Sequence, residues 1–173
     1  QPIGILAQFA GKYAESLSDA TGMTVCITDR EQVIAASGDD KKNLMNKPVT
    51  KELNQAMEGR CTIAAGEGED GFVKVTDEAQ FKQEIMYPII CQGDVLGTVL
   101  MMSIDMKPKF TDNEKKMVKT AANFFRKAHG VVEYAFYLAI VRTDIALKMY
   151  VRPTRLCCLA VLVGFCQFKD EKV

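Results

Sequence analysis

The sequence predicts an α+β fold, in which the N- and C-terminal helices of the domain pack on one face of a central antiparallel sheet. Apolar residues recur at three- and four-residue intervals near the start of the chain and again after Pro108, which is typical of amphipathic helices. Between them, short β-rich runs are paired across polar turns, as in hairpins. With 173 residues, 48% of them apolar, the chain can bury the core of one domain and carry an appendage.

The first helix is predicted over residues 4–20, with its end near Gly22. Residues at this spacing form a single stripe, which must pack against a sheet or another helix. The stripe consists of Leu6, Phe9, Tyr13 and Leu17.

The middle of the chain predicts a hairpin, a short helix and a loop. Residues 23–29 and 32–38 are β-rich runs joined by a polar turn. A polar stretch with several lysines follows, and it is interpreted as a solvated face or, alternatively, as an anion-contacting rim on a pocket. Thr50 then opens a helix that ends at Glu58. The glycines in 66–71 have acidic neighbours that would repel a phosphate, so this segment is predicted to be a mobile loop.

The second hairpin, over 84–91 and 95–103, is apolar on both faces, as expected of strands at the centre of a sheet. Gly97 offers no side chain to pack, which predicts a bulge or the close approach of another backbone. Thr111 and Glu114 have the spacing of a capping box and open the last helix. The apolar stripe of that helix is Met117, Val118, Ala121, Ala122 and Phe125.

The order of these segments resembles a GAF domain, most clearly at "PIICQGDVLGTVLMM" followed by "FTDNEKKMVKTAANF". Together with "QPIGILAQFAGKYAESL", "VCITDREQVIAASG" and "KKNLMNKPVTKELNQAMEGR", residues 1–127 resemble the C-terminal sensor half of the stage V sporulation protein T family. These are AbrB-type transcription regulators of spore-forming bacteria. The resemblance implies an upstream swapped-hairpin DNA-binding domain, which this sequence does not contain, and DNA contact only through that domain. It also implies a bacterial cytoplasmic protein, in the forespore.

Composition excludes several function classes. The 22 basic and 22 acidic side chains cancel, so the chain is not expected to bind DNA or an anionic membrane by charge alone. The start has no basic region typical of a signal peptide. There is no CxxC motif and His129 is the only histidine, which argues against a metal site and against Ser-His or Cys-His catalysis. The six cysteines are interpreted as reduced thiols, and no cofactor is expected.

The apolar hairpin carries hardly any catalytic group, and it is therefore predicted to form the floor of a pocket whose loops supply polar specificity. The candidate ligand-binding residues are Ser37, Lys41, Lys42, Cys61, Phe72 and Tyr87. Each of these residues has an alternative, purely structural role: at the edge of the core, in a turn, or as a surface charge that keeps the protein soluble. The asparagine-lysine-phenylalanine-aspartate-glutamate signature of cyclic-nucleotide-binding GAF domains is missing, which leaves an unidentified small effector.

Two other functions compete with effector sensing. A pure oligomerisation module would have a filled interior and no ligand. A methionine-sulfoxide-reducing GAF enzyme would need Cys61 and Cys91 on neighbouring strands for thiol exchange, and a non-enzymatic protein is preferred over it. The first and last helices are the expected self-association surface of a dimer or tetramer. The candidate interface residues are Phe9, Tyr13, Val118 and Ala122, with the last two expected to face outward.

Residues 128–173 form an atypical apolar tail. Of the last 43 residues 28 are apolar, against 55 of the preceding 130, and the uncharged run 156–168 is too short to span a bilayer. With permitted codons for "FFRKAHGVV", deletion of one T gives Phe-Leu-Gly-Lys-His-Met-Glu-stop, which resembles the family's terminal helix. The tail, from about residue 125 onward, is therefore predicted to come from a frameshift and to be non-native. The alternatives are a membrane-touching or partner-binding tail and a lineage-specific extension.

Overall fold

A computed structural model describes residues 3–105 and 110–129 of the chain. The chain divides into two units, residues 1–132 and 133–173, and the description that follows concerns the first. The predicted tail, with its frameshift origin, falls outside the described residues except at positions 128 and 129.

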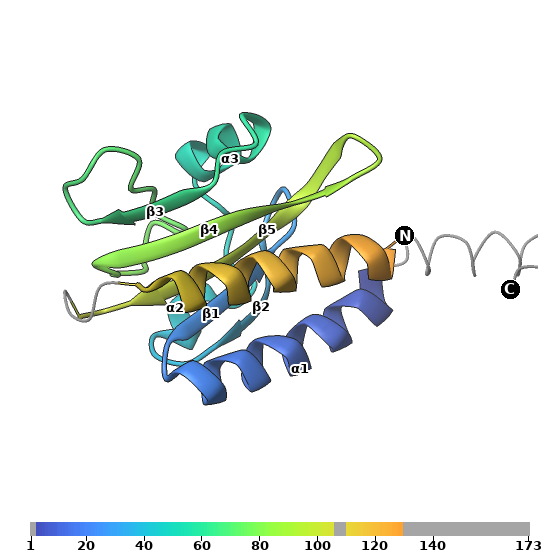
Figure 1. Cartoon of the computed structure of the whole chain (residues 1–173), viewed down its shortest axis with the longest axis horizontal. Coiled ribbons are helices and arrows are strands. Elements are labelled where there is room, and N and C mark those ends of the chain that lie inside the picture. Colours follow the sequence, from blue (N-terminus) through green and yellow to red (C-terminus); the bar gives the residue numbers. More distant parts are fainter. Residues whose placement is uncertain (1–2, 106–109, 130–173) are drawn as a thin grey trace, which may run out of the picture. The chain divides into compact units, whose positions relative to one another are not determined.

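Five strands form one antiparallel sheet with the order β2-β1-β5-β4-β3 (Figure 1). The elements are α1 (Ile3–Thr21), β1 (Thr24–Thr28), β2 (Val33–Ser37), α2 (Lys41–Leu44), α3 (Lys51–Glu58), β3 (Ile63–Gly66), β4 (Gln83–Cys91) and β5 (Asp94–Ser103). A last helix covers residues 112–129 of the described range. Both predicted hairpins are present, and the last strand of the sheet in the sequence, β5, lies at its centre.

The tight turn between β4 and β5 explains how the second hairpin closes. Gln92 and Gly93 both have positive φ, 52° and 95°, as required at the two central positions of the turn that best matches the twist of a hairpin. The register shifts between Ile89 and Ile90, opposite Gly97 and Val95. A Cβ on Gly97 would lie 1.9 Å from the backbone oxygen of Thr28 on β1. The predicted bulge and close backbone approach therefore both occur here.

An apolar layer covers each face of the sheet. Along β5, Val99 and Met101 point to one layer and Leu100 and Met102 to the other, and all four are fully buried. The layer under α1 and the 112–129 helix contains Ala10, Ala14, Val25, Ile27, Ala35, Ile85, Ile89, Val99, Met101, Val118, Ala121, Ala122 and Phe125. The layer under α2, α3 and residues 72–81 contains Cys26, Val33, Ala36, Leu44, Leu53, Met57, Ile63, Ala65, Val75, Ala79, Phe81, Met86, Leu100 and Met102.

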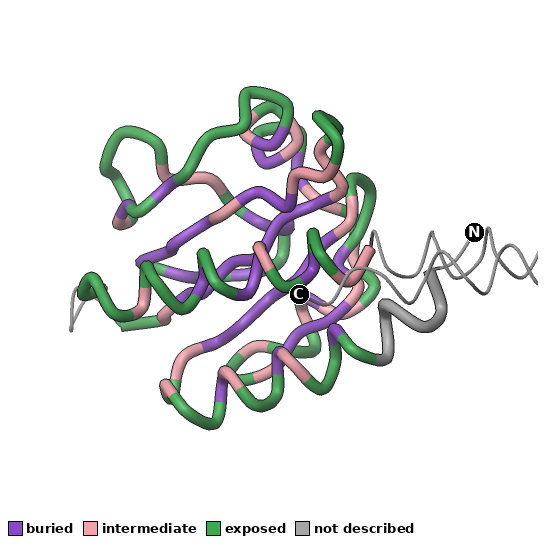
Figure 2. Tube along the Cα trace, turned by 45° about the vertical axis from the view of Figure 1, so that its right-hand side comes forward, coloured by how far each residue is buried: buried purple, intermediate pink, exposed green. Residues whose placement is uncertain are grey.

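Figure 2 shows the buried residues running along the strands and the inner sides of the helices. The prediction that the N- and C-terminal helices of the domain share one face of an antiparallel sheet is confirmed. The lysine-rich segment contains one element that the sequence did not predict, the single-turn helix α2.

Local hydrogen bonds set the helix ends. The N–H of Gly22, at φ 68°, donates to the Ser18 carbonyl at 2.7 Å and ends α1. The Thr50 hydroxyl accepts from the N–H of Leu53 at 3.1 Å, as predicted for the start of α3. At the last helix, the N–H of Thr111 donates to the Glu114 carboxylate at 2.7 Å, which is half of the predicted capping box.

Candidate functional site

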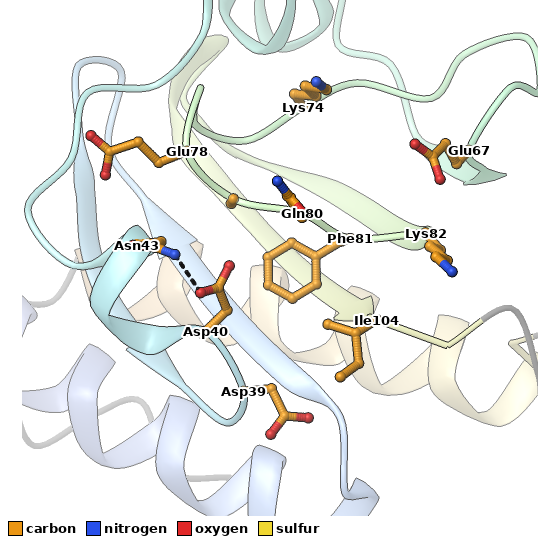
Figure 3. A pocket seen from close by; sticks show the side chains of 11 residues that line it. Asp39, Asp40, Asn43, Glu67, Lys74, Glu78, Gln80, Phe81, Lys82 and Ile104 are labelled. Carbon is orange, nitrogen blue, oxygen red and sulfur yellow. Dashed lines mark hydrogen bonds between the residues drawn. The ribbon is translucent and has the colours of Figure 1, made fainter.

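A cleft of about 910 Å³ opens beside the sheet, on the side of α2 (Figure 3). This volume lies within the range of small-molecule sites, about 300 to 1,000 Å³. Segments far apart in the sequence contribute its walls: the turn before α2, α2 itself, the segment 67–82 and the residue after β5. The lining residues are Asp39, Asp40, Asn43, Glu67, Lys74, Glu78, Ala79, Gln80, Phe81, Lys82 and Ile104.

An apolar floor lies between the walls. The ring of Phe81 faces the cleft beside Ile104 (Figure 3). Phe81 is buried because it belongs to the apolar layer beneath α2 and α3, whereas Ile104 is 43% exposed. A ligand with an apolar body would therefore find a partly desolvated surface between polar walls.

Hydrogen bonds from two buried threonines hold the wall that precedes β4. The Thr76 hydroxyl donates to the Asn43 carbonyl of α2 at 3.0 Å and accepts from the N–H of Ala79 at 3.3 Å. The Thr50 hydroxyl donates to the Lys74 carbonyl at 2.5 Å, and the Thr50 N–H donates to the Val75 carbonyl at 3.0 Å. These bonds fix the segment 74–79 against α2 and α3, so the cleft is largely pre-formed.

The charges of the cleft are of both signs. Asp40 accepts a hydrogen bond from the Asn43 amide at 2.6 Å, and Glu78 lies 2.7 Å from the Lys47 ammonium. Four exposed side chains, Asp39, Glu67, Lys74 and Lys82, have no side-chain partner within the described residues. The cleft thus presents charges that no ion pair satisfies.

Glu84, at the start of β4, is a buried carboxyl next to this wall. It is 1% exposed, and its Oε1 accepts a hydrogen bond from the N–H of Val73 at 2.6 Å. Burial raises the pKa of Glu84 to about 7, while the bond from Val73 opposes part of that rise. We did not single out this residue from the sequence, although a carboxyl within an otherwise apolar strand is a signal that could have identified it.

The six predicted ligand residues do not line this cleft, and the structure does not bring them together. Ser37 and Lys41 line a separate groove of about 350 Å³ between α1, β2 and α2. Lys42 and Cys61 are exposed. Phe72 packs against the layer beneath α2 and α3, whereas Tyr87 packs against the helix-side layer, with the Lys119 ammonium 5.9 Å from its ring centre. Phe72 and Tyr87 therefore lie on opposite faces of the sheet.

The second hairpin is not the floor of an open pocket. Met86, Leu100 and Met102 are fully buried in the layer beneath α2 and α3. Protein covers them because α3 and residues 72–81 lie across these strands. The apolar floor comes instead from Phe81 and Ile104, which lie just outside the two strands.

The prediction that Val118 and Ala122 face outward is wrong. They are 0% and 2% exposed, because both point from the 112–129 helix into the layer over the sheet. Phe9, in contrast, is 58% exposed, and half-buried Tyr13 stacks on Phe124 with 5.1 Å between ring centres. The exposed apolar side chains of the last helix are Met117 and Phe124, at 39% and 43%.

The thiols of the described residues do not converge. Cys26 is buried, which raises the pKa of its thiol, while Cys61 is exposed. Strands β3 and β4 do pair, but the register Ile63↔Met86 places position 61 opposite position 88. Cys91 is three residues farther, about 10 Å along the strand. In the described part of the chain, no three His, Cys, Asp or Glu side chains gather as a metal site, and no helix has the length and apolarity to cross a membrane.

Comparisons with known proteins agree with this architecture. Residues 5–129 match the family described as "Stage V sporulation protein T C-terminal, transcription factor". The chain is 32% identical over 126 residues to stage V sporulation protein T of Bacillus subtilis (strain 168), which covers 73% of this chain and 70% of the relative.

Solved structures of low sequence identity share the fold. The GAF domain of an Acinetobacter phosphoenolpyruvate-protein phosphotransferase superposes with a TM-score of 0.59 at 11% identity, covering 76% of this chain and 84% of that one. A free methionine-R-sulfoxide reductase of Neisseria meningitidis, solved with its substrate, has a TM-score of 0.59 at 16% identity, over 75% and 80% of the two chains. At these identities the likeness concerns the fold alone.

Proposed function

Since this chain belongs to the family of stage V sporulation protein T C-terminal domains, a family of transcription factors, we propose that it senses a small effector for such a regulator. Effector binding and self-association of the GAF domain would together control DNA binding by an upstream AbrB-type domain. The protein would act in the bacterial cytoplasm, in the forespore, and without catalysis of its own.

The cleft over Phe81 is the main support for the proposal that the protein senses an effector. It combines an apolar floor with charged side chains that lack ion-pair partners, on walls that threonine hydrogen bonds hold in place. A convergence of a few polar groups over an apolar surface is the usual composition of a small-molecule site. An effector spanning the walls would connect α2 to the segment 67–82.

The helix face supports the self-association part of the proposal. Phe9, Met117 and Phe124 expose apolar surface on α1 and the 112–129 helix, the two helices that cover one face of the sheet. Tyr13 and Met117 also line a groove of about 350 Å³. Apolar side chains grouped on one face are favourable to bury against a second copy.

A pure oligomerisation module remains the rival function, and one observation favours it. The layer beneath α2 and α3 consists of buried apolar side chains, among them the fully buried Met86, Leu100 and Met102, as expected of a filled core. The rival and the sensor differ in one respect: only the sensor uses the cleft at the rim of that layer.

Native mass spectrometry of the full chain, purified from cell extract without denaturation, tests the proposal. A sensor is expected to show an excess mass of small-molecule size that denaturation releases, on a dimer or tetramer. The Gln80→Trp variant, which places a bulky side chain at the cleft, should lose that mass and keep the same subunit number. A clean oligomer without any adduct, also after incubation with a small-molecule extract, would support the oligomerisation module instead.

A further inference from the structure

We propose that the cleft over Phe81 binds a short apolar peptide in zwitterionic form, with its ammonium at Asp39 and Asp40 and its carboxylate at Lys74 and Lys82. This inference rests on the proposed function, because it names the chemical class of effector for the same cleft.

The two walls of the cleft carry different sets of charges. Asp39 and Asp40 come from the turn before α2, whereas Lys74 and Lys82 come from the opposite segment, 67–82. In Figure 3 Asp39 lies below the Phe81 ring and Asp40 lies to its left, whereas Lys74 lies above the ring and Lys82 to its right. The 67–82 wall also carries Glu67 and Glu78, of which Glu78 is paired with Lys47. Apart from that pair, the α2 wall presents two carboxylates, whereas the 67–82 wall presents two ammonium groups and one carboxylate.

These opposite charges do not neutralise one another. Within the described residues, neither Lys74 nor Lys82 has a carboxylate within ion-pair distance, and Asp39 has no cationic partner. Their charges therefore remain available to a ligand. A ligand with both charges would make two charge-assisted hydrogen-bond contacts, which are about twice as strong as neutral ones.

An uncharged surface lies between these charges. Phe81 and Ile104 are apolar, and Gln80 and Asn43 are neutral hydrogen-bonding groups suited to peptide amides. A free amino acid has its two charges on one carbon and would occupy only a small part of a cleft of this volume. A peptide of a few apolar residues separates the charges, places side chains on Phe81 and suits a cleft of about 910 Å³.

The same charges argue against other ligand classes. Apart from Glu78, which is paired with Lys47, the cleft has three carboxylates and two ammonium groups, so a phosphate or nucleotide with several negative charges would meet net repulsion. Glu67 lies on the basic wall, near Lys82, without an ion-pair partner, and it should weaken the attraction of a carboxylate. Removing the charge of Glu67 is therefore expected to strengthen peptide binding.

Isothermal titration of the full chain with three probes tests the inference: tri-leucine, N-acetyl-tri-leucine and tri-leucine amide. Free tri-leucine is expected to bind, and each capped peptide is expected to bind at least about tenfold more weakly, because it has lost one charge contact. Equal binding of all three peptides would overturn the proposal that the ligand binds through both of its terminal charges. So would the absence of binding at about 1 mM peptide.

Three variants assign the charges, and a fourth is the matched control. Asp39→Asn should weaken only peptides with a free ammonium, and Lys82→Gln only peptides with a free carboxylate. Glu67→Gln should tighten tri-leucine binding several-fold. Lys51→Gln, an exposed change on α3 outside the cleft, should leave binding unchanged. Circular dichroism confirms that each variant is folded, which is expected because these side chains are exposed.

The result also separates this inference from the proposed function. If native mass spectrometry detects a cleft-bound adduct while no peptide binds, the proposal of a peptide ligand is wrong, whereas the proposed sensor function is supported. If no adduct is detected and no peptide binds, both the sensor function and the peptide ligand are wrong.

Discussion

Glu84 has a carboxyl that is 1% exposed and accepts a hydrogen bond from the N–H of Val73, and burial raises its pKa to about 7 from an ordinary 4.5. Because the folded pKa exceeds the unfolded one, the folded state holds a proton that the unfolded state releases between about pH 4.5 and 7. The contribution of this carboxyl to the free energy of unfolding is therefore expected to be complete below about pH 4.5. The free energy of unfolding should then fall by about 3 kcal/mol as the pH rises through 7.

The variant Glu84→Gln tests this pH dependence. The amide is neutral at every pH and can still accept the Val73 N–H, so the variant should be more stable than the wild type at pH 8 and similar to it at pH 5. The free energy of urea unfolding at both pH values measures the effect. Glu31→Gln, which changes an exposed carboxylate, is the control. A wild type whose stability does not fall between pH 5 and 8 relative to Glu84→Gln would contradict the prediction.

Gly97 is the second residue whose environment leads to a sharp expectation. An added Cβ would meet the Thr28 backbone oxygen at 1.9 Å, so Gly97→Ala must push β5 away from β1 in the middle of the sheet. We expect a loss of about 3 kcal/mol in the free energy of unfolding. Gly11→Ala is the matched control: nothing lies within 4 Å of the place that its new methyl group would take on α1, so it should stabilise by about 0.5 to 1 kcal/mol. Equal effects of the two substitutions would refute the argument.

At the scale of elements, the 112–129 helix has one side that packs on the sheet and another that is exposed and available to a second copy. Val118 is buried, so Val118→Asp should unfold the domain by placing a charge in the layer over the sheet. Phe124 is 43% exposed, so Phe124→Glu should keep the fold, at a cost of about 1 kcal/mol for its ring contact with Tyr13. The same variant should lower the oligomeric mass.

Light scattering after size exclusion, with circular dichroism for the fold, measures both effects. Lys127→Glu, an exposed charge reversal on the same helix, serves as the control and should keep the wild-type mass. A folded Phe124→Glu variant with an unchanged mass would rule out this face as the association surface.

Element by element, what could be predicted depended on local patterns. The cap at Thr50, the helix end at Gly22 and the turn at Gln92-Gly93 each depend on a few neighbouring residues, and all three are present in the structure. The apolar stripe of the last helix was also recognised, but a stripe does not show which of its positions face the sheet. The structure places Val118 and Ala122 inside and leaves Met117 at the edge.

The cleft could not be predicted for a different reason. Its residues come from three distant segments, and only the sheet order and the path of residues 67–82 bring Asp39, Phe81 and Ile104 together. For the same reason the sequence did not show which of the six predicted ligand residues lie together: Phe72 and Tyr87 both carry an aromatic ring, but they lie on opposite faces of the sheet.

At the scale of the whole molecule, the residues described up to 129 contain the complete sheet and both apolar layers. A chain that ends after residue 129 is therefore expected to fold and to keep the wild-type melting temperature, followed by circular dichroism. Its solubility should rise, since the apolar tail is removed. Loss of folding in this truncated chain would contradict the prediction. Sequencing the DNA across the Phe124 and Phe125 codons checks the frameshift separately, because an intact frame in independent clones would reject it.

The position of β5 has a consequence for how the protein is made. It is the last strand to leave the ribosome, yet it occupies the middle of the sheet, between β1 and β4. Until residues 94–103 emerge, the nascent chain consists of two separate strand pairs, each with an unpaired edge and an apolar face. Pairing over such sequence separations is slow, and exposed edges attract chaperones or other chains. Synthesis of nearly the whole domain must therefore precede its folding, which makes the pace of translation through β5 a determinant of yield.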